Sequence, residues 1–278
     1  MTWQEAFDAC REKLREAGVP EPEADAWVLM QYVSGIDRTF WLLHRGEAMP
    51  AETLAAYETA CGRRAKRVPL QHITGEQSFM GLSFAVTGDV LVPRQDTETL
   101  AEEALRDLRG GMRVLDVCTG SGCILLSLLA LCPNAAGTGT DISPEALAVA
   151  RENAGRLGLR AEWICGDLFA EAEGPFDMIV SNPPYIPTEE IGTLMDEVRL
   201  YDPRGALDGG PDGLAFYRRI LAGCGPYLSE GGHILLEIGA DQAAAVSEMM
   251  REHGFTDIRT VRDLSGRDRV VRGRKKNV

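Results

Sequence analysis

The alternation of short apolar runs with amphipathic stretches after Met112 constrains the fold more than any other feature of this chain. Because helices separate several of the strand-like runs, neighbouring strands should run parallel. We therefore expect an α/β fold with a doubly wound, mainly parallel, seven-stranded sheet. The predicted strands are 112–117, 136–140, 161–165, 176–181, 232–238, 255–261 and 268–272, and the predicted helices are 122–131, 144–157, 213–227 and 241–252.

Residues 1–72 show a different pattern, with apolar side chains at helical spacing. Helix starts follow Pro22 and Pro50, so we expect a small bundle of four or five short helices. Its aromatic residues either form the core of the bundle or a surface for a partner. These residues are Trp3, Trp27, Phe40 and Trp41.

Residues 73–92 change period again, because apolar residues alternate there between glycines. This pattern predicts a β-hairpin that links the helical bundle to the region 93–278. The linked region begins with a helix that runs through Leu108, and Asp96 is a candidate for its N-cap. A later helix is expected to start with Ser143 as N-cap and Pro144 in its first turn.

Charge and composition exclude several classes of protein. The 278 residues carry a net charge of −13, and residues 73–256 alone carry 12 basic and 28 acidic side chains. Such an acidic region repels phosphates, which disfavours stable DNA binding. No apolar run has the length of a membrane helix, and the N-terminus lacks the pattern of a signal peptide, so we expect a cytoplasmic protein without membrane contact. Seven scattered cysteines and four histidines form no ligand pattern, so we expect reduced thiols and no metal site.

The run from Ser181 to Ile186 is the first candidate for a functional site. It follows a predicted buried strand, so Asn182 lies where a parallel strand ends, and open α/β sheets bind their ligands at that edge. Pro183 and Pro184 stiffen the loop and leave carbonyl oxygens without competing N–H groups. Such a loop suits a planar amine or amide, although an ordinary proline turn is the alternative.

A glycine turn follows the first strand of the predicted sheet. The sequence from Asp116 to Gly122 has the spacing D-x-x-x-G-x-G, and its glycines allow a ligand to approach the backbone. A dinucleotide fingerprint requires a third small residue, but Leu125 stands at that position. The spacing instead matches the S-adenosylmethionine turn of class I methyltransferases, in which the Asp lies near the amino group of the cofactor.

Two further strand ends carry acidic residues. Asp141 is placed to accept both ribose hydroxyls of either cofactor class, with a solvated carboxylate as the alternative. Asp167 and Leu168, after the third strand, would bring an acceptor and an apolar side chain to an adenine ring. Together with the glycine turn and Asn182, these residues occupy four successive strand ends, which predicts one shared cavity.

These motifs resemble the PrmC/HemK family of peptide chain release factor glutamine methyltransferases. The resemblance covers almost the whole chain, including the helical region, the hairpin, the segment 93–98, Leu207 to Gly210 and Glu237 to Gly239. The Asn-Pro-Pro-Tyr tetrapeptide alone also occurs in adenine and cytosine amino-methyltransferases. Two positions depart from the family, because Gln95 replaces a usual proline and Leu168 replaces a frequent aromatic residue.

The resemblance implies a class I S-adenosylmethionine-dependent methyltransferase that methylates the side-chain amide of the glutamine in a Gly-Gly-Gln motif. The implied catalytic residues are Asn182, Pro183 and Tyr185. Substrate binding would further involve Pro184, Arg94 and Glu98. The implied cofactor-binding residues are Asp116, Cys118, Thr119, Gly120, Ser121, Gly122, Asp141, Asp167, Leu168 and Asn182.

The resemblance also implies partners. We expect a monomer whose bundle, residues 1–72, docks the release factor. A ribosomal-protein glutamine methyltransferase is the alternative with the same chemistry, and an adenine amino-methyltransferase would require a basic surface. A non-catalytic nucleotide-binding protein remains a further alternative. The basic end from Arg272 to Lys276 is either a solvated terminus or an RNA contact.

Overall fold

The computed structural model describes residues 1–277, which form two compact units. Unit 1 contains Met1–Gly75 and the short segment Met195–Tyr201. Unit 2 contains Glu76–Leu194 and the chain from Asp202 onward. No helix among residues 1–277 is long and apolar enough to cross a membrane.

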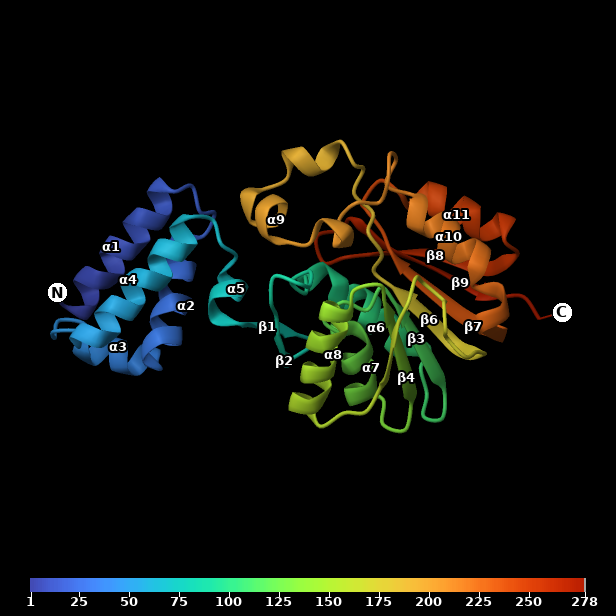
Figure 1. Cartoon of the computed structure of the whole chain (residues 1–278), viewed down its shortest axis with the longest axis horizontal. Helices are drawn as coiled ribbons and strands as arrows, with labels where there is room; N and C mark the ends of the chain where they lie inside the picture. Colours follow the sequence, from blue (N-terminus) through green and yellow to red (C-terminus); the bar gives the residue numbers. More distant parts are fainter. Residues whose placement is uncertain (278) are drawn as a thin grey trace. The chain divides into compact units, whose positions relative to one another are not determined.

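Unit 1 is helical, as the sequence predicts (Figure 1). Thr2 caps its first helix, and the Glu5 carboxylate accepts from the Thr2 backbone N–H in return. The three tryptophans are less than a tenth exposed and belong to the core, whereas Phe40 is 37% exposed. The helices are α1 (Trp3–Glu16), α2 (Pro22–Ser34), α3 (Arg38–His44), α4 (Ala51–Ala65), α5 (Leu70–Thr74) and α9 (Asp196–Tyr201).

Helix α9 returns to unit 1 from a distant part of the sequence and was not predicted. The Glu197 carboxylate pairs with Arg64 at 2.8 Å and with Arg67, and both arginines come from the end of α4 and the residues after it. The Tyr201 hydroxyl donates to the carbonyl of Lys66 at 2.9 Å. Because Glu197 is the shared partner of two arginines, it is the main polar anchor of this helix.

The predicted hairpin is confirmed by the antiparallel pair β1 (Glu76–Phe79) and β2 (Leu82–Ala85). Its two turn residues, Met80 and Gly81, both have positive φ, as a tight hairpin turn requires. The prediction that Asp96 caps the next helix is wrong. A 3-10 turn, η1 (Gln95–Thr97), precedes α6 (Glu98–Asp107), and the Asp96 carboxylate pairs with Arg269 at 3.2 Å.

The predicted seven-stranded sheet is confirmed. The strand order is β5-β4-β3-β6-β7-β9-β8, with β9 antiparallel to both neighbours and the other pairs parallel. The order reverses between β3 and β6, which is where ligands bind in open α/β sheets. The strands are β3 (Arg113–Val117), β4 (Ala136–Asp141), β5 (Glu162–Cys165), β6 (Phe176–Ser181), β7 (Leu228–Glu237), β8 (Phe255–Arg262) and β9 (Asp268–Lys275).

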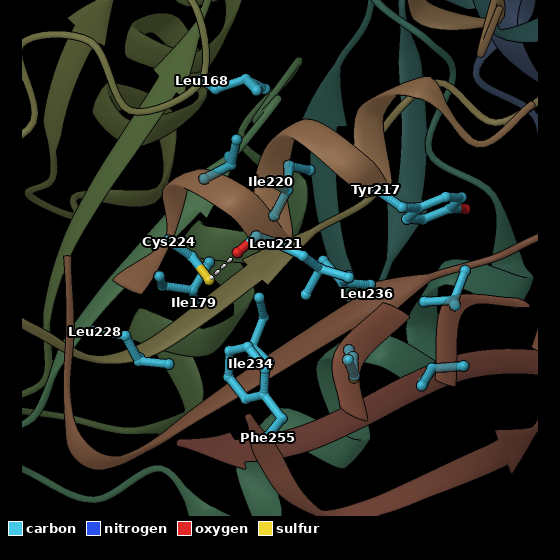
Figure 2. Packing of buried hydrophobic residues seen from close by; sticks show 14 of the residues in the cluster. Leu168, Ile179, Tyr217, Ile220, Leu221, Cys224, Leu228, Ile234, Leu236 and Phe255 are labelled. Atoms are coloured by element: carbon cyan, nitrogen blue, oxygen red, sulfur yellow. Dashed lines mark hydrogen bonds between the residues drawn. The ribbon is translucent and has the colours of Figure 1, made fainter. Parts of the chain in front are cut away.

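Alternate side chains of the central strands enter two separate core clusters. Leu115 and Ile179 pack with α10 (Ala215–Gly223) and α11 (Ala243–Glu252), in the cluster that Figure 2 shows. Val114 and Met178 pack with α6 and α7 (Cys123–Leu131). Helix α8 (Pro144–Leu157) begins with Ser143 as N-cap and Pro144 in its first turn, as predicted. Short 3-10 turns complete unit 2: η2 (Glu190–Thr193), η3 (Arg204–Ala206) and η4 (Gly225–Tyr227).

Candidate active site

A cavity of about 280 Å³ lies in unit 2 at the carboxyl ends of the central strands. It collects residues from the loops after β3, β4, β5 and β6, so the four predicted strand ends meet in one place. Ten of the predicted site residues line it: Arg94, Cys118, Thr119, Gly120, Ser121, Asp141, Asp167, Leu168, Asn182 and Pro184. The other five, Glu98, Asp116, Gly122, Pro183 and Tyr185, are not among its lining residues.

Asp116 lies at the end of β3 and is fully buried. Thr119 donates a hydrogen bond to its Oδ2 at 2.6 Å, whereas Oδ1 has no hydrogen-bond partner among residues 1–277. Burial raises the pKa of Asp116 to about 7, although the bond from Thr119 opposes this shift. A buried oxygen without a partner beside the cavity-lining Thr119 suits a cationic group of a ligand.

The glycine turn brings backbone to the cavity. Gly120 and Gly122 both have positive φ, and a Cβ at Gly122 would lie 2.9 Å from the ring of Trp163. The Gly120 N–H donates to Asp141 Oδ2 at 2.9 Å, and the Ser143 N–H donates to Oδ1 at 3.0 Å. These bonds fix the Asp141 carboxylate and leave each oxygen a further lone pair for a ligand.

The rim near β5 is partly apolar. Leu168 is 8% exposed and belongs to the core cluster of Figure 2, and Asp167 forms an ion pair with Arg219 at 2.5 Å. Ile142 and Phe216 also line the cavity, and the sequence analysis missed both. An apolar residue directly after a strand-end carboxylate was the available signal for Ile142, which is 72% exposed.

The Asn-Pro-Pro-Tyr loop begins at the end of β6, where the Ser181 hydroxyl donates to the Val117 carbonyl at 2.6 Å. The Asn182 Nδ2 donates to Thr97 Oγ1 at 3.3 Å, and its Oδ1 takes no hydrogen bond from residues 1–277. The Tyr185 hydroxyl donates to Glu237 Oε1 at 3.4 Å, and burial raises the Tyr185 pKa. The amide oxygen of Asn182 is therefore available to a ligand in the cavity.

Residues that follow this loop by about 25 to 60 positions in the sequence hold it in place. The Gln242 Nε2 donates to the Tyr185 carbonyl at 2.9 Å. A Cβ added at Gly209 would lie 2.7 Å from Tyr185 Cα, and one at Gly213 would collide with the backbone carbonyl oxygen of Tyr185. The sequence analysis quoted Gly209 only as part of a motif and missed Gly213 and Gln242. Close backbone packing explains why glycine stands at both positions.

Arg94 and Glu98 have different surroundings. Arg94 lines the cavity and pairs with the buried Asp202 at 2.5 Å. Glu98 Oε1 accepts from the Met80 backbone N–H at 2.7 Å and so anchors the hairpin. Within residues 1–277, no group of three or more His, Cys, Asp or Glu side chains is arranged to hold a metal ion.

The reversed strand order and the cavity that joins the glycine turn to the Asn-Pro-Pro-Tyr loop define a class I methyltransferase. Family models agree, because "PrmC N-terminal domain" matches residues 5–75 and "Methyltransferase small domain" matches residues 95–198. Two relatives named release factor glutamine methyltransferase are 44% identical to this chain over almost its whole length, so the chain belongs to the release factor glutamine methyltransferase family.

Two relatives with that name carry the assignment. The protein of Geobacter sulfurreducens is 44% identical over 98% of this chain and 96% of its own length. The protein of Caulobacter vibrioides is 44% identical over 99% of this chain and 97% of its own. A methyltransferase structure from Pyrococcus furiosus is similar in fold alone, with a TM-score of 0.53 and 20% identity over 72% of this chain and 91% of that one.

Proposed function

We propose that this protein transfers a methyl group from S-adenosylmethionine to the side-chain amide nitrogen of the glutamine in the Gly-Gly-Gln motif of peptide chain release factors. The observation that carries the proposal is the position of Asn182. Its free amide oxygen and the β3 glycine turn belong to one cavity, so an amide substrate and a cofactor would meet there. The names of the relatives support the choice of a release factor as the substrate.

The residues of the cavity fit this cofactor. Asp116 does not itself line the cavity but is bonded by the lining residue Thr119, and its unpartnered Oδ1 suits the cationic amino group. The remaining lone pairs of Asp141 suit the ribose hydroxyls. Leu168 and Ile142 provide apolar contacts for the adenine ring. When bound, the cofactor supplies an electrophilic methyl group, because this group is attached to a positively charged sulfur.

The Asn-Pro-Pro-Tyr loop must make a poor nucleophile, the amide nitrogen of the substrate, reactive. An amide nitrogen shares its lone pair with the carbonyl group, so its reaction depends on alignment and on stabilisation of the positive charge that develops. We assign the Asn182 Oδ1 and the Pro183 carbonyl oxygen as acceptors of the two N–H bonds. Once the nitrogen carries the methyl group, it is strongly acidic, so water can take its extra proton and a strong base is unnecessary.

The remaining residues of the loop keep it rigid. Pro183 and Pro184 fix the backbone, and both are buried. Tyr185, which the resemblance places on the substrate, packs against the core cluster of Figure 2 and bonds Glu237. We therefore assign Tyr185 to holding the loop and excluding water.

Purified release factor and purified ribosomal proteins, incubated separately with the protein and S-adenosylmethionine, test the substrate. Mass spectrometry should find one added methyl group on the glutamine of the Gly-Gly-Gln motif. Release factors from cells that lack the protein should miss that group. Methylation of ribosomal protein alone would favour the alternative, and absence of cofactor binding in calorimetry would contradict both.

Unit 1 would dock the release factor. Its helix α3 exposes Leu42 and Leu43, which are 67% and 73% exposed, and its helix α2 exposes Tyr32, which is 54% exposed. The double variant Leu42→Ser and Leu43→Ser should lower kcat/KM for intact release factor several-fold, because it removes apolar surface from the contact. Cofactor binding should not change. Leu264→Ser, at a position 94% exposed in unit 2, is the matched control, and equal loss in both variants would contradict the docking role.

A further inference from the structure

One wall of the cavity comes from a segment that, apart from Arg94, the sequence analysis did not assign to the site. Residues 86–94 lead from β2 to η1, and five of them line the cavity. Val86 and Val90 are buried and form one cluster with Ala146 and Val149 of α8. The segment 86–94 therefore packs on α8 and contributes one wall of the cavity. Its lining residues are Asp89, Val90, Leu91, Pro93 and Arg94.

The side chain of Asn153, also on α8, binds the residue that precedes this segment. Its Oδ1 accepts a hydrogen bond from the Ala85 N–H at 2.7 Å, and its Nδ2 donates to the Ala85 carbonyl at 3.1 Å. Ala85 is the last residue of β2. Two residues that face each other in an antiparallel sheet can exchange a pair of bonds in the same way, so Asn153 fixes the end of the hairpin as a neighbouring strand would.

The same side chain also holds the glycine turn. Asn153 Nδ2 donates to the Ser121 carbonyl at 3.0 Å, and Ser121 lies between Gly120 and Gly122. An amide NH₂ group has two protons, and here it has two carbonyl acceptors. Asn153 is fully buried and is not among the residues that line the cavity. Its hydrogen bonds therefore join the end of the hairpin to the glycine turn and leave no proton for a ligand.

We propose that Asn153 is a positioning residue for cofactor binding, because it holds two walls of the cavity, the glycine turn and the segment 86–94, at a fixed separation. The proposal rests on the proposed function in one respect, namely that the cavity binds S-adenosylmethionine. Asn153 itself would touch neither the cofactor nor the reacting atoms. Because coupling between two sites is reciprocal, a cofactor between the two walls should in turn stabilise the bonds from Asn153 to Ala85 and Ser121.

Asn153→Leu keeps the approximate size of the side chain and removes all three hydrogen bonds. In calorimetry, the dissociation constant of S-adenosylmethionine should rise about tenfold, while kcat at saturating cofactor stays within about twofold of wild type. Asn153→Asp keeps the acceptor for the Ala85 N–H, loses both donors, and should weaken binding by a similar factor. Met250→Ala, at a fully buried position on α11, is the control for lost stability and should keep the wild-type affinity. Unchanged affinity in both Asn153 variants, or an equal loss in Met250→Ala, would overturn the proposal.

Amide hydrogen exchange gives a second readout, which needs no substituted protein. In wild type, S-adenosylmethionine should slow exchange of the Ala85 N–H, because a bound cofactor opposes separation of the two walls. The Gly266 N–H, in the turn between β8 and β9, is the reference and should not respond. Exchange at Ala85 that ignores the cofactor would contradict the proposal.

Exchange in the free proteins separates this proposal from the proposed function. If the wild type binds no S-adenosylmethionine, the proposed function fails, and the glycine turn still reports on Asn153. Exchange of the Gly122 N–H, which donates to the Thr119 carbonyl at 2.9 Å, should be faster in Asn153→Asp than in wild type and unchanged in Met250→Ala. Equal exchange at Gly122 in wild type and Asn153→Asp would show that Asn153 does not position the turn.

Discussion

The two loops that meet in the cavity are built in different ways. The glycine turn after β3 combines bonds inside its own motif with bonds to residues of the next strand and helix. Thr119 bonds Asp116 three residues away, whereas the Gly120 N–H bonds Asp141 and the Asn153 side chain bonds the Ser121 carbonyl. The Asn-Pro-Pro-Tyr loop is held by distant residues: Thr97 lies 85 residues from Asn182, and Gln242 lies 57 from Tyr185. The first loop therefore holds part of its geometry through bonds within its own motif, whereas the side-chain bonds of the second come from residues much further away in sequence.

Among the variants, Asn182→Ala should distinguish the roles of the two loops most clearly, because it should lower turnover without lowering cofactor affinity. The variant removes an acceptor that would stabilise the charge on the substrate nitrogen, so turnover should fall by about 10²–10³. Cofactor affinity should stay within a few-fold, because the glycine turn keeps its own contacts. Steady-state kinetics and calorimetry give the two values. Wild-type turnover would refute the role of Asn182, and a large loss of cofactor affinity would show that the loops are not independent.

Gly209→Ala should disturb the Asn-Pro-Pro-Tyr loop, although Gly209 lies outside the loop in sequence. The new Cβ would lie 2.7 Å from Tyr185 Cα, so the loop must shift, at a cost of about 1–3 kcal/mol in unfolding free energy. We expect kcat/KM for release factor to fall roughly tenfold or more, since sub-ångström alignment governs the transfer. Gly192→Ala is the matched control, because nothing lies within 4 Å of its Cβ. Equal activity in both variants would mean that the loop does not depend on this contact.

This difference between the loops also explains what the sequence could predict. The strands, their mainly parallel order and the glycine turn follow from local period and spacing, and the structure confirms the fold. The residues that contact the Asn-Pro-Pro-Tyr loop cannot be predicted from local period and spacing, because nothing near Gln242 or Gly213 in sequence indicates that they contact Tyr185.

Two smaller differences between the sequence prediction and the structure have the same origin. Asp96 has the residue type of an N-cap, yet its carboxylate pairs with Arg269, and α6 starts after a 3-10 turn. Helix α9 packs in unit 1 through Glu197, with arginines more than a hundred residues earlier in the chain. Both outcomes depend on tertiary ion pairs that local periodicity does not contain.

Cofactor affinity at the glycine turn should depend on pH and should not depend on changes in the Asn-Pro-Pro-Tyr loop. Burial raises the pKa of Asp116 to about 7, so the free protein holds this carboxyl neutral below that pH. If the cationic amino group of the cofactor requires the carboxylate, binding releases a proton, and affinity should fall about tenfold between about pH 8 and about pH 6.

Calorimetry in buffers of different ionisation enthalpy measures both the affinity and the proton released. Asp116→Asn should bind the cofactor more weakly and without this pH dependence, while Asn182→Ala should retain it. An affinity that is the same at both pH values in wild type would mean that Asp116 is not the partner of the amino group. Such a result would also remove the reason for an unpaired Oδ1 at the end of β3.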